Sequence, residues 1–235
     1  MQQVRGGGAR QTLIFDADDT LWENNIYFKR VVDDYINWVA HPTLDRDQIR
    51  LMLNDIEAAN IGTHGYGSQA FLHNLAECLH RLRERPADEA ERAAIAELAS
   101  GLVAHQIELM PGVAEALSDL GTRHELLLLT KGARDEQQRK VDASGLAGHF
   151  AGVHIVAEKD AETYRSLIER ESLPVSSTWM IGNSPKSDIV AARAAGLRAV
   201  FIPHRYTWEL EHSELDPHDD HVLVLDSFPE LLQHF

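Results

Sequence analysis

Groups of polar and charged residues follow four separate apolar runs of this sequence. The groups are Asp16-Ala17-Asp18-Asp19-Thr20, Thr130-Lys131-Gly132, Glu158-Lys159-Asp160 and Gly182-Asn183-Ser184-Pro185-Lys186-Ser187-Asp188. If the apolar runs are parallel strands, their carboxyl ends meet at one edge of a sheet, which is where open α/β sheets bind ligands. The sequence therefore predicts a single site that combines carboxylates with a hydroxyl group and an ammonium group.

The acidic charge at this predicted edge requires a counter-charge. Asp16, Asp18 and Asp188 would converge there, and two like charges roughly 4 Å apart repel by about 4 kcal/mol at an effective dielectric constant near 20. Lys159 supplies one positive charge. A divalent ion can supply the rest, and Mg²⁺ fits because it accepts a few carboxylates together with a substrate phosphate. We therefore expect Mg²⁺ as the cofactor and a small anionic substrate.

The four groups resemble, in order, the four motifs of the haloacid dehalogenase (HAD) superfamily. The first motif, a hydrophobic residue followed by DxDx[TV], corresponds to Phe15-Asp16-Ala17-Asp18-Asp19-Thr20. The resemblance implies that Asp16 is the nucleophile that attacks phosphorus and forms an aspartyl-phosphate. It also implies that Asp18 is the general acid for the leaving group and then the base for water, and that its main-chain carbonyl binds the metal. An acid in this role needs a raised pKa, which we expect from neighbouring carboxylates and from closure of the site.

The remaining motifs assign further roles by the same resemblance. Thr130 corresponds to the hydroxyl residue that binds a phosphoryl oxygen, and Lys159 to the lysine that pairs with the phosphoryl oxygens and with the nucleophile. The fourth motif usually has two acidic residues after a glycine, whereas this chain has Asn183 at the first acidic position and Asp188 at the second. Because an amide oxygen carries no charge, we expect Asn183 to be a weak ligand or a hydrogen-bonding neighbour of the metal, and Mg²⁺ affinity to be reduced. The implied metal ligands are Asp16, Asp18, Asp188 and Asn183.

The spacing of the apolar runs predicts the fold. Near-continuous apolar runs are typical of strands buried on both faces of a parallel sheet. The runs are Thr12–Phe15, Leu126–Leu129, Val153–Val156, Thr178–Ile181, Ala199–Ile202 and Val222–Leu225. The last five lie roughly 20–25 residues apart, as in strand–helix–strand units, but about 110 residues separate the first two. We therefore predict a doubly wound, Rossmann-like α/β core with an all-helical cap inserted after the first strand.

The predicted domain limits follow from this pattern. The core comprises residues 11–22 and 109–235, the cap residues 23–108, and residues 1–10 form a flexible tail. Helices are expected in the cap, with Asp45 as the N-cap of the second and a break in the stretch Gly62-Thr63-His64-Gly65-Tyr66-Gly67 after it. The expected helices are Ile26–Ala40, Asp45–Ala59, Gln69–Arg85 and Ala87–Val103.

Residues in the cap, or where the chain enters it, are candidates for substrate binding. Their alternative roles are packing in the cap, movement at its junction with the core, or exposure at the surface. Two residues after the second strand could also reach an anion. The candidates are Trp22, Asn24, Tyr27, His64, Tyr66, Lys131 and Gly132.

The composition limits the partners. The 37 acidic and 22 basic residues give a formal charge of −15, which argues against general nucleic-acid binding. The longest aliphatic run, Leu126–Leu129, is far shorter than the roughly 20 residues of a membrane span, and residues 1–11 lack the apolar core of a signal peptide. The single Cys78 excludes an internal disulfide and a cysteine-based zinc site, and we expect it to be buried. We expect a cytoplasmic monomer or homodimer that binds neither nucleic acid nor membranes.

Several functions remain open. The leading expectation is a Mg²⁺-dependent phosphatase that hydrolyses a small phosphorylated metabolite. A phosphomutase would use the same core, and a 2-haloacid dehalogenase would use the same nucleophile without needing Asp18 or a metal. An alternative of another class is a catalytically silent protein that binds phosphate or metal. Asn183, in place of an acidic motif residue, would be its first departure from the catalytic pattern. A receiver domain of a response regulator uses similar residues but is about half this length and lacks the helical insertion.

Overall fold

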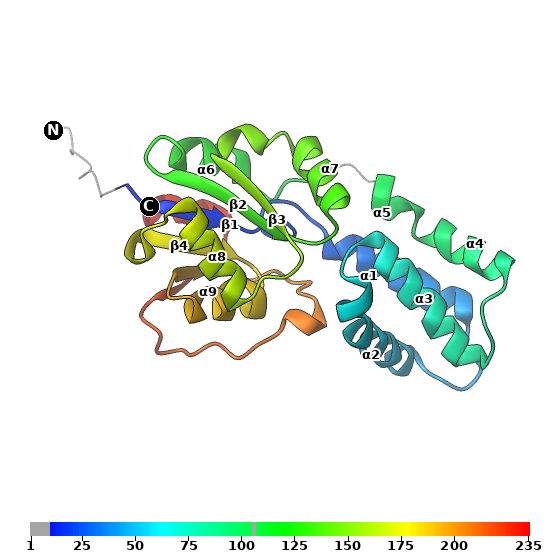
Figure 1. Cartoon of the computed structure of the whole chain (residues 1–235). Helices are drawn as coiled ribbons and strands as arrows, with labels where there is room; N and C mark the ends of the chain where they lie inside the picture. The colour runs from blue at the N-terminus through cyan, green and yellow to red at the C-terminus, as the bar shows by residue number, and fades with distance from the viewer. Residues whose placement is uncertain (1–9, 105–106) are drawn as a thin grey trace.

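The computed structural model of the chain describes residues 10–104 and 107–235, so the predicted tail, apart from Arg10, lies outside the described residues. The core is a six-stranded parallel sheet with the order β3-β2-β1-β4-β5-β6 (Figure 1). Its strands are β1 (Thr12–Phe15), β2 (Glu125–Lys131), β3 (Gly152–Val156), β4 (Thr178–Gly182), β5 (Arg198–Phe201) and β6 (Val222–Val224). This arrangement confirms the predicted doubly wound α/β class.

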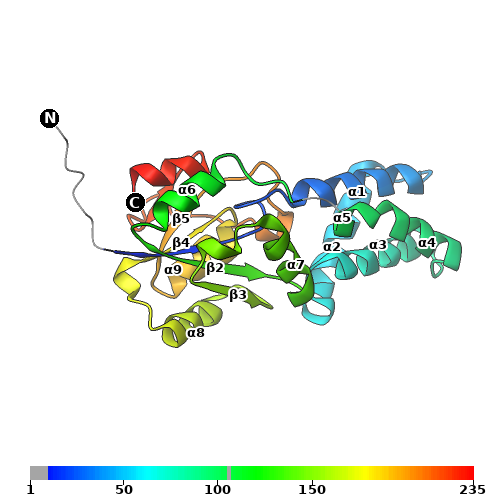
Figure 2. The same ribbon diagram turned by 90° about the horizontal axis from the view of Figure 1, so that it is seen from above.

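Helices cover both faces of the sheet and form a further group beyond one of its edges (Figures 1 and 2). The helices that flank the sheet are α6 (Val113–Leu120), α7 (Arg134–Ser144), α8 (Ala161–Glu171) and α9 (Ala191–Ala194). The helices after β1, which we call the helical unit, are α1 (Asn25–Val39), α2 (Arg46–His64), α3 (Ser68–Arg83), α4 (Glu89–Leu98) and α5 (Ser100–Ala104). Shorter segments are a π-helix (Pro185–Val190) and 3₁₀ turns at Ala147–His149, Val175–Ser177, Glu209–Glu211 and Phe228–Gln233. Across the described ranges, no helix is both long enough and apolar enough to cross a membrane.

The strand order reverses beside β1. The chain passes from β1 to β2 and β3 on one side and then returns to β4, which pairs with β1 on the other side. Strands β1 and β4 therefore flank the switch point, where open α/β sheets bind ligands beyond the carboxyl ends of the strands. Asp16 follows β1 and Asn183 follows β4, so the topology alone places these two residues at the switch point.

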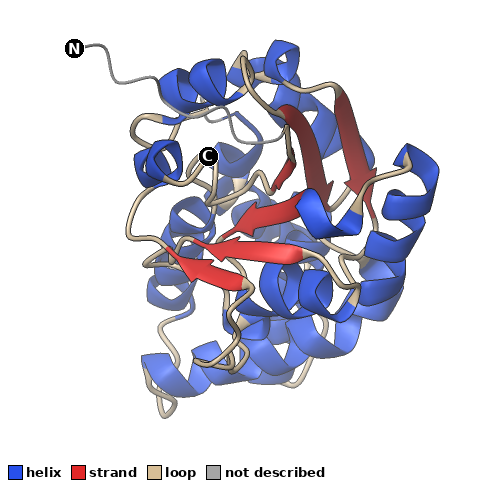
Figure 3. Cartoon of the chain, turned by 90° about the vertical axis from the view of Figure 1, so that its left-hand side faces the viewer, coloured by secondary structure: helices blue, strands red, loops and turns tan. Residues whose placement is uncertain are grey.

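Helices lie against both faces of the sheet (Figure 3), and the side chains that alternate along the central strands pack into two apolar layers. Leu13 and Phe15 of β1 pack with Val113 of α6 and Val141 of α7 on one face. Ile14, which points to the opposite face, packs in a separate cluster with residues of α8 and α9. Because successive side chains of a strand point to opposite faces, an apolar run of four residues serves both layers.

The helical unit has a hydrophobic core of its own. Tyr35 of α1, Leu53 of α2 and Leu75 of α3 are fully buried there, and Cys78 is fully buried with them, as expected. The Tyr35 hydroxyl donates to the main-chain oxygen of Leu75 (3.0 Å), which satisfies the polar group that this packing buries. Figure 2 shows the unit beyond the carboxyl ends of the strands.

The helix boundaries of the helical unit differ from the prediction by more than two residues in two places. The last predicted helix is divided into α4 and α5, which meet at Ala99. Helix α2 begins with Asp45 as N-cap, as predicted, through a capping box with Gln48. It continues past the predicted end at Ala59 to His64, because the helix tolerates Gly62 and the chain leaves it only at Gly65, whose φ of 68° suits glycine.

Two hydrogen-bonded segments join the helical unit to the core. The main-chain nitrogen of Glu23 donates to the oxygen of Glu108 (2.9 Å), and that of Met110 donates to the oxygen of Leu21 (2.9 Å). We call residues 21–23 and 108–110 the neck. The chain therefore enters and leaves the helical unit at nearly the same point.

The buried position of Leu128 in β2 leads to a test of the core. Leu128 is fully buried, so we expect Leu128→Ala to lower the free energy of unfolding by about 2–5 kcal/mol, through lost burial and the cavity left behind. Leu51→Ala is the matched control because Leu51 is 62% exposed, and we expect it to change the free energy by less than about 0.5 kcal/mol. Urea denaturation of both variants measures this, and equal losses would contradict the assigned core.

A buried histidine before β2 leads to a pH test. Burial, together with the charge of Arg123, lowers the pKa of His124, and its Nδ1 accepts a hydrogen bond from the main-chain nitrogen of Gln11 (3.3 Å). As the pH falls below about 6.5, the unfolded chain binds this proton first, so His124 stabilises the fold above that pH and the stabilisation is lost below it. We expect the unfolding free energy of His124→Gln to fall less steeply than that of the wild type between about pH 7.5 and 5. Equal slopes would contradict this, and the exposed His218→Gln is the control.

Candidate active site

A cavity of about 540 Å³ lies between the carboxyl ends of the strands and the helical unit. Residues of α1, α2 and α3 form one wall, and the loops after the strands form the other. The residues of the core wall that were predicted as catalytic or metal-binding are Asp16, Asp18, Thr130, Lys159, Asn183 and Asp188. The fold therefore brings all six to one space.

Lys159 joins two of the predicted carboxylates. Its ammonium group donates to Oδ1 of Asp188 (2.8 Å) and to Oδ1 of Asp16. Asp16 follows β1, Lys159 precedes α8, and Asp188 lies in the π-helix after β4. Lys159 is 4% exposed and Asp188 1% exposed, so the charges meet away from water, where an unpaired charge would be costly.

The environment of Asp16 sets its protonation. Burial and the charge of Asp188 raise the pKa of Asp16 to about 7, although Lys159 acts in the opposite direction. The Thr20 hydroxyl donates to Oδ2 of Asp16 (3.0 Å) and orients the carboxylate. A further positive charge beside Asp16 would favour the ionised form, which is the form that a nucleophile needs.

Asp18 accepts hydrogen bonds from three side chains, of which the sequence analysis named only Trp22, and that as a candidate for substrate binding. Lys140 donates to both carboxylate oxygens (3.1 and 2.9 Å), Gln137 to Oδ2 (3.0 Å) and the Trp22 indole to Oδ1 (2.7 Å). Burial acts to raise the pKa of Asp18, but the Lys140 charge and these hydrogen bonds outweigh it, and the pKa is lowered. The expected rise is therefore wrong. Lys140 and Gln137 were missed because nothing in the polar sequence of α7 separates them from surface residues.

Gln137 also connects Asp18 with the second predicted motif. Its amide nitrogen donates to Oγ1 of Thr130 (2.7 Å) and to the main-chain oxygen of Lys131 (2.9 Å). Thr130 is buried at the end of β2. One buried amide on α7 therefore fixes the end of β2 relative to the loop after β1.

The oxygen atoms around Asn183 fit a divalent cation. The end of the Asn183 amide that faces the site lies 3.3 Å from Oδ2 of Asp16, 3.2 Å from the main-chain oxygen of Asp18 and 3.1 Å from Oγ1 of Thr20. If this end is the amide oxygen, it lies among other oxygen atoms, and a cation between them would offset the repulsion. If this end is the amide nitrogen, it donates hydrogen bonds to these oxygen atoms. Carboxylate, carbonyl and amide oxygens are the donors that Mg²⁺ prefers. The donor set predicted from the sequence is therefore chemically suited to Mg²⁺.

Lys131 forms ion pairs with two carboxylates at the wall of the cavity. Its ammonium group contacts Glu158 (3.2 Å), Glu211 and the Ser187 hydroxyl (2.9 Å), and it lies 4.5 Å from the centre of the Tyr66 ring. The Tyr66 hydroxyl donates to Glu158. Because Tyr66 lies between α2 and α3, these contacts join the helical unit to the core.

Two more contacts hold the helical unit against the core. The Trp208 indole donates to Glu57 of α2 (3.1 Å), and both the main-chain nitrogen and the hydroxyl of Ser68 donate to Glu136 (2.8 Å each). Trp208 precedes the 3₁₀ turn after β5, a region in which the sequence shows no recognisable motif. The helical unit is therefore held over the cavity and forms the wall opposite the strand ends.

The substrate-binding candidates divide into two groups. Those that line the cavity are Asn24, Tyr66, Lys131 and Gly132. Trp22 is buried and donates to Asp18, the Tyr27 hydroxyl donates to Glu108, and the centre of the His64 ring lies 4.0 Å from that of His73; none of the three is part of the cavity lining. The structure thus brings four of the seven candidates to the cavity.

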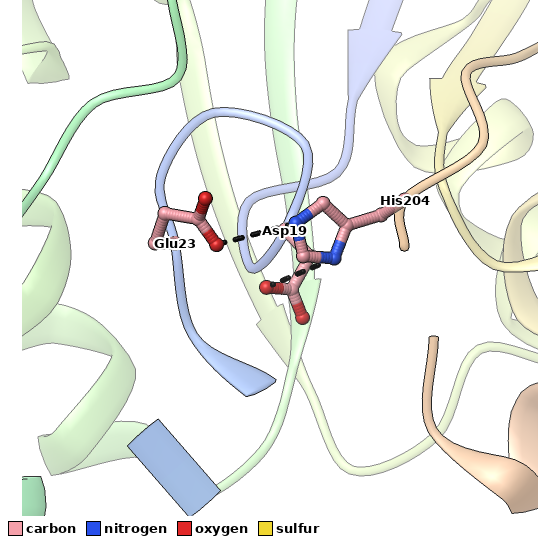
Figure 4. A group of neighbouring side chains, drawn as sticks. All are labelled: Asp19, Glu23 and His204. Carbon is pink, nitrogen blue, oxygen red and sulfur yellow. Dashed lines mark ion pairs between the residues drawn. The ribbon is translucent and has the colours of Figure 1, made fainter. Parts of the chain in front are cut away.

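A second cluster of titratable groups lies at the junction with the helical unit (Figure 4). His204, from the segment after β5, faces Asp19 (3.5 Å) through Nδ1 and Glu23 (3.2 Å) through Nε2. The ligand atoms of the three residues lie within 4.8 Å of one another, so the cluster could hold a metal ion. Asp19 also accepts hydrogen bonds from the main-chain nitrogens of Asn24 and Asn25 (2.9 and 3.0 Å) and thereby caps the start of α1.

Most of the chain matches a known family. A family model for haloacid dehalogenase-like hydrolases matches residues 11–196. The chain therefore belongs to the haloacid dehalogenase-like hydrolase family.

The chain is also similar to individual proteins and solved structures. A phosphoserine phosphatase from Thermus thermophilus is 34% identical over 82 residues, which are 33% of this chain and 33% of that protein, so the match spans about a third of the relative. The crystal structure of a haloacid dehalogenase-like family hydrolase from Xanthomonas campestris has a TM-score of 0.82 and 26% identity, over 97% of this chain and 96% of that one. The L-2-haloacid dehalogenase from Xanthobacter autotrophicus has a TM-score of 0.63 and 18% identity, over 95% and 97%, and shows the fold alone.

The close approach of Gly182 to Asp188 leads to a test of the metal-binding prediction. A Cβ atom at Gly182 would lie 2.2 Å from Oδ2 of Asp188, so Gly182→Ala must displace that carboxylate. We expect Mg²⁺ binding, measured by calorimetry, to weaken by at least about tenfold, since a shift of about 1 Å is large for an octahedral site.

Gly148→Ala is the matched control for this variant, because a Cβ there has no heavy atom within 4 Å. Thermal unfolding of both variants shows whether the fold is intact. Unchanged Mg²⁺ affinity in a folded Gly182→Ala protein would show that Asp188 does not hold the metal.

Proposed function

We propose that this protein is a Mg²⁺-dependent phosphatase that hydrolyses a small phosphomonoester through an aspartyl-phosphate on Asp16. The observation that carries the proposal is a second carboxylate, Asp18, which lines the same cavity two residues after Asp16. Ester hydrolysis needs an acid for the leaving oxygen and a base for water, whereas a carbon–halogen bond releases an anion that needs no proton. The partial match to a phosphoserine phosphatase supports the same choice.

In the first step of this mechanism, a carboxylate oxygen of Asp16 attacks phosphorus and the bond from phosphorus to the ester oxygen breaks. Lys159 and the Thr130 hydroxyl stabilise the charge on the phosphoryl oxygens. Mg²⁺, held by Asp16, Asp18, Asn183 and Asp188, would keep Asp16 ionised and neutralise phosphoryl charge. Lys159 also fixes Asp16 relative to Asp188, so the nucleophile is positioned before the substrate arrives.

Asp18 acts in both steps of this mechanism, the formation of the aspartyl-phosphate and its hydrolysis by water, and it needs a different protonation state in each. The lowered pKa of Asp18 keeps its carboxylate ionised before substrate binds, which suits the later step in which it takes a proton from water. For the first step it must carry a proton, and a phosphate dianion placed beside it raises its pKa. Lys140, Gln137 and Trp22 hold the carboxylate in one orientation throughout.

The helical unit acts as the cap of the active site in this proposal. Its contacts through Tyr66, Ser68 and Glu57 close the cavity over Asp16. Substrate entry requires these contacts to open, and their reformation excludes water from the phosphoryl group. We also propose residues 23–108 as the limits of this cap, with residues 11–22 and 109–235 as the core.

Phosphate release from a panel of small phosphomonoesters, with Mg²⁺ or with a chelator, tests the proposal. We expect release to depend on Mg²⁺ and to fall by at least about 10³-fold in Asp16→Asn, which removes the nucleophile. Asp135→Asn is the matched control, because Asp135 is exposed on α7 and makes no side-chain contact with the cavity. We expect this control to retain wild-type activity.

The other functions would give different results. Halide release from 2-haloacids without metal would contradict the role given to Asp18 and indicate a dehalogenase. Transfer of phosphate between two positions of a sugar or diol phosphate, without release, would indicate a mutase. Binding of Mg²⁺ and phosphate without turnover of any ester would indicate a catalytically silent binding protein.

A further inference from the structure

Helix α2 presents a row of polar side chains to the active-site cavity. Arg50, Asn54 and Glu57 lie four and three residues apart, so they share one face of the helix, and all three line the cavity. None of them belongs to the four motifs of the core. The row lies on the wall opposite Asp16 and can therefore contact only the part of a substrate that is remote from the phosphoryl group.

Arg50 stands out in this row because its guanidinium group has no close acceptor. It makes no hydrogen bond or ion pair with any residue that the structure describes, although the chain has 37 acidic and 22 basic residues. Arg46, one turn earlier in the same wall, instead contacts Asp33 (2.7 Å) and Asn37 (2.5 Å). The charge of Arg50 acts at longer range on Glu57, whose carboxylate accepts the Trp208 indole. A half-buried guanidinium with free donors facing a cavity is suited to binding an anion.

Asn54 provides an unpaired hydrogen-bond acceptor on the same wall. Its Oδ1 atom is buried and has no hydrogen-bond partner among the described residues. A buried oxygen of this kind costs free energy unless a donor reaches it. A ligand that satisfies both residues therefore has acidic oxygens for Arg50 and a neighbouring hydroxyl or amino group for Asn54.

We propose that Arg50 and Asn54 form a subsite for a second acidic group of the substrate, with the phosphoryl group at Asp16. This inference rests on the function proposed above and narrows its substrate class. The substrate is a phosphomonoester whose far end carries acidic oxygens next to a hydroxyl or amino donor. The planar guanidinium group pairs equally well with the oxygens of a carboxylate or of a second phosphate, and the experiment separates the two.

Matched pairs of esters test the subsite. The first pair is 3-phosphoglycerate and glycerol 3-phosphate, the second O-phosphoserine and O-phosphoethanolamine, and the third the bisphosphate and monophosphate of 1,3-propanediol. For each pair the readout is the ratio of kcat/KM for the doubly acidic ester to that for its partner. We expect a wild-type ratio above about 10 for the carboxylates or for the bisphosphate, as one charge-assisted bidentate contact allows.

Substitution of Arg50 shows whether this preference comes from the subsite. In Arg50→Met we expect the ratio to fall at least about tenfold, mainly because KM for the doubly acidic ester rises. In Arg50→Lys we expect the ratio to recover in part, because lysine keeps the positive charge but lacks the planar pair of donors of the guanidinium group. Arg46→Met is the control, because Arg46 lies in the same wall but is already paired, and its ratio should equal that of the wild type. A wild-type ratio near 1 in all pairs, or a ratio unchanged in folded Arg50→Met, would overturn the proposal.

Direct binding separates failure of the subsite from failure of the proposed function. If the wild type hydrolyses none of the esters, calorimetry with 3-phosphoglycerate and glycerol 3-phosphate, in Mg²⁺, still compares the wild type with Arg50→Met. Tighter binding of 3-phosphoglycerate that is lost in Arg50→Met would support the subsite without phosphatase activity. Equal binding of the two ligands by both proteins would reject the subsite.

Discussion

The contact of the Lys159 ammonium with both Asp16 and Asp188 is the interaction on which the site depends. Both carboxylates are buried and contact the same ammonium group; burial and the charge of Asp188 raise the pKa of Asp16, and Lys159 opposes that rise. The three residues come from the ends of different strands, and the contact therefore fixes the relative positions of the loops after β1, β3 and β4. One lysine does not balance the negative charge of Asp16, Asp18 and Asp188, and this excess of negative charge makes the edge of the sheet suited to a divalent cation.

The sequence was sufficient to predict the core and the convergence of its motif residues. Apolar runs such as Thr12–Phe15 cannot face water on either side, and a parallel sheet between helices is the arrangement that buries them. Once the sheet is parallel, the residues after its strands must meet at one edge. The placement of Asp16, Lys159 and Asp188 then follows from chain order, without knowledge of any side-chain contact.

The features that could not be predicted depend on packing between elements distant in the sequence. Lys140 resembles any surface lysine of a polar helix, yet the packing of α7 directs it to Asp18 and reverses the expected direction of that pKa. Trp208 meets Glu57 across 151 positions of the chain. His64 was a candidate for substrate binding, but α2 extends to His64 and the His64 ring lies against that of His73 instead. In each case the residue type was informative, but its neighbours were set by helix length and orientation.

The two halves of the neck lie side by side, so the helical unit begins and ends at nearly the same point of the core. Because the Glu23 nitrogen bonds the Glu108 oxygen, the segment between them could be exchanged for a helical insertion of another size, provided that the new ends also meet. The six-stranded sheet and the Lys159 contact lie outside this segment and would keep their geometry. Under the function proposed above, the core carries the chemistry and the helical unit contributes to recognition, so residues of the helical unit could change without altering the groups that contact the phosphoryl group.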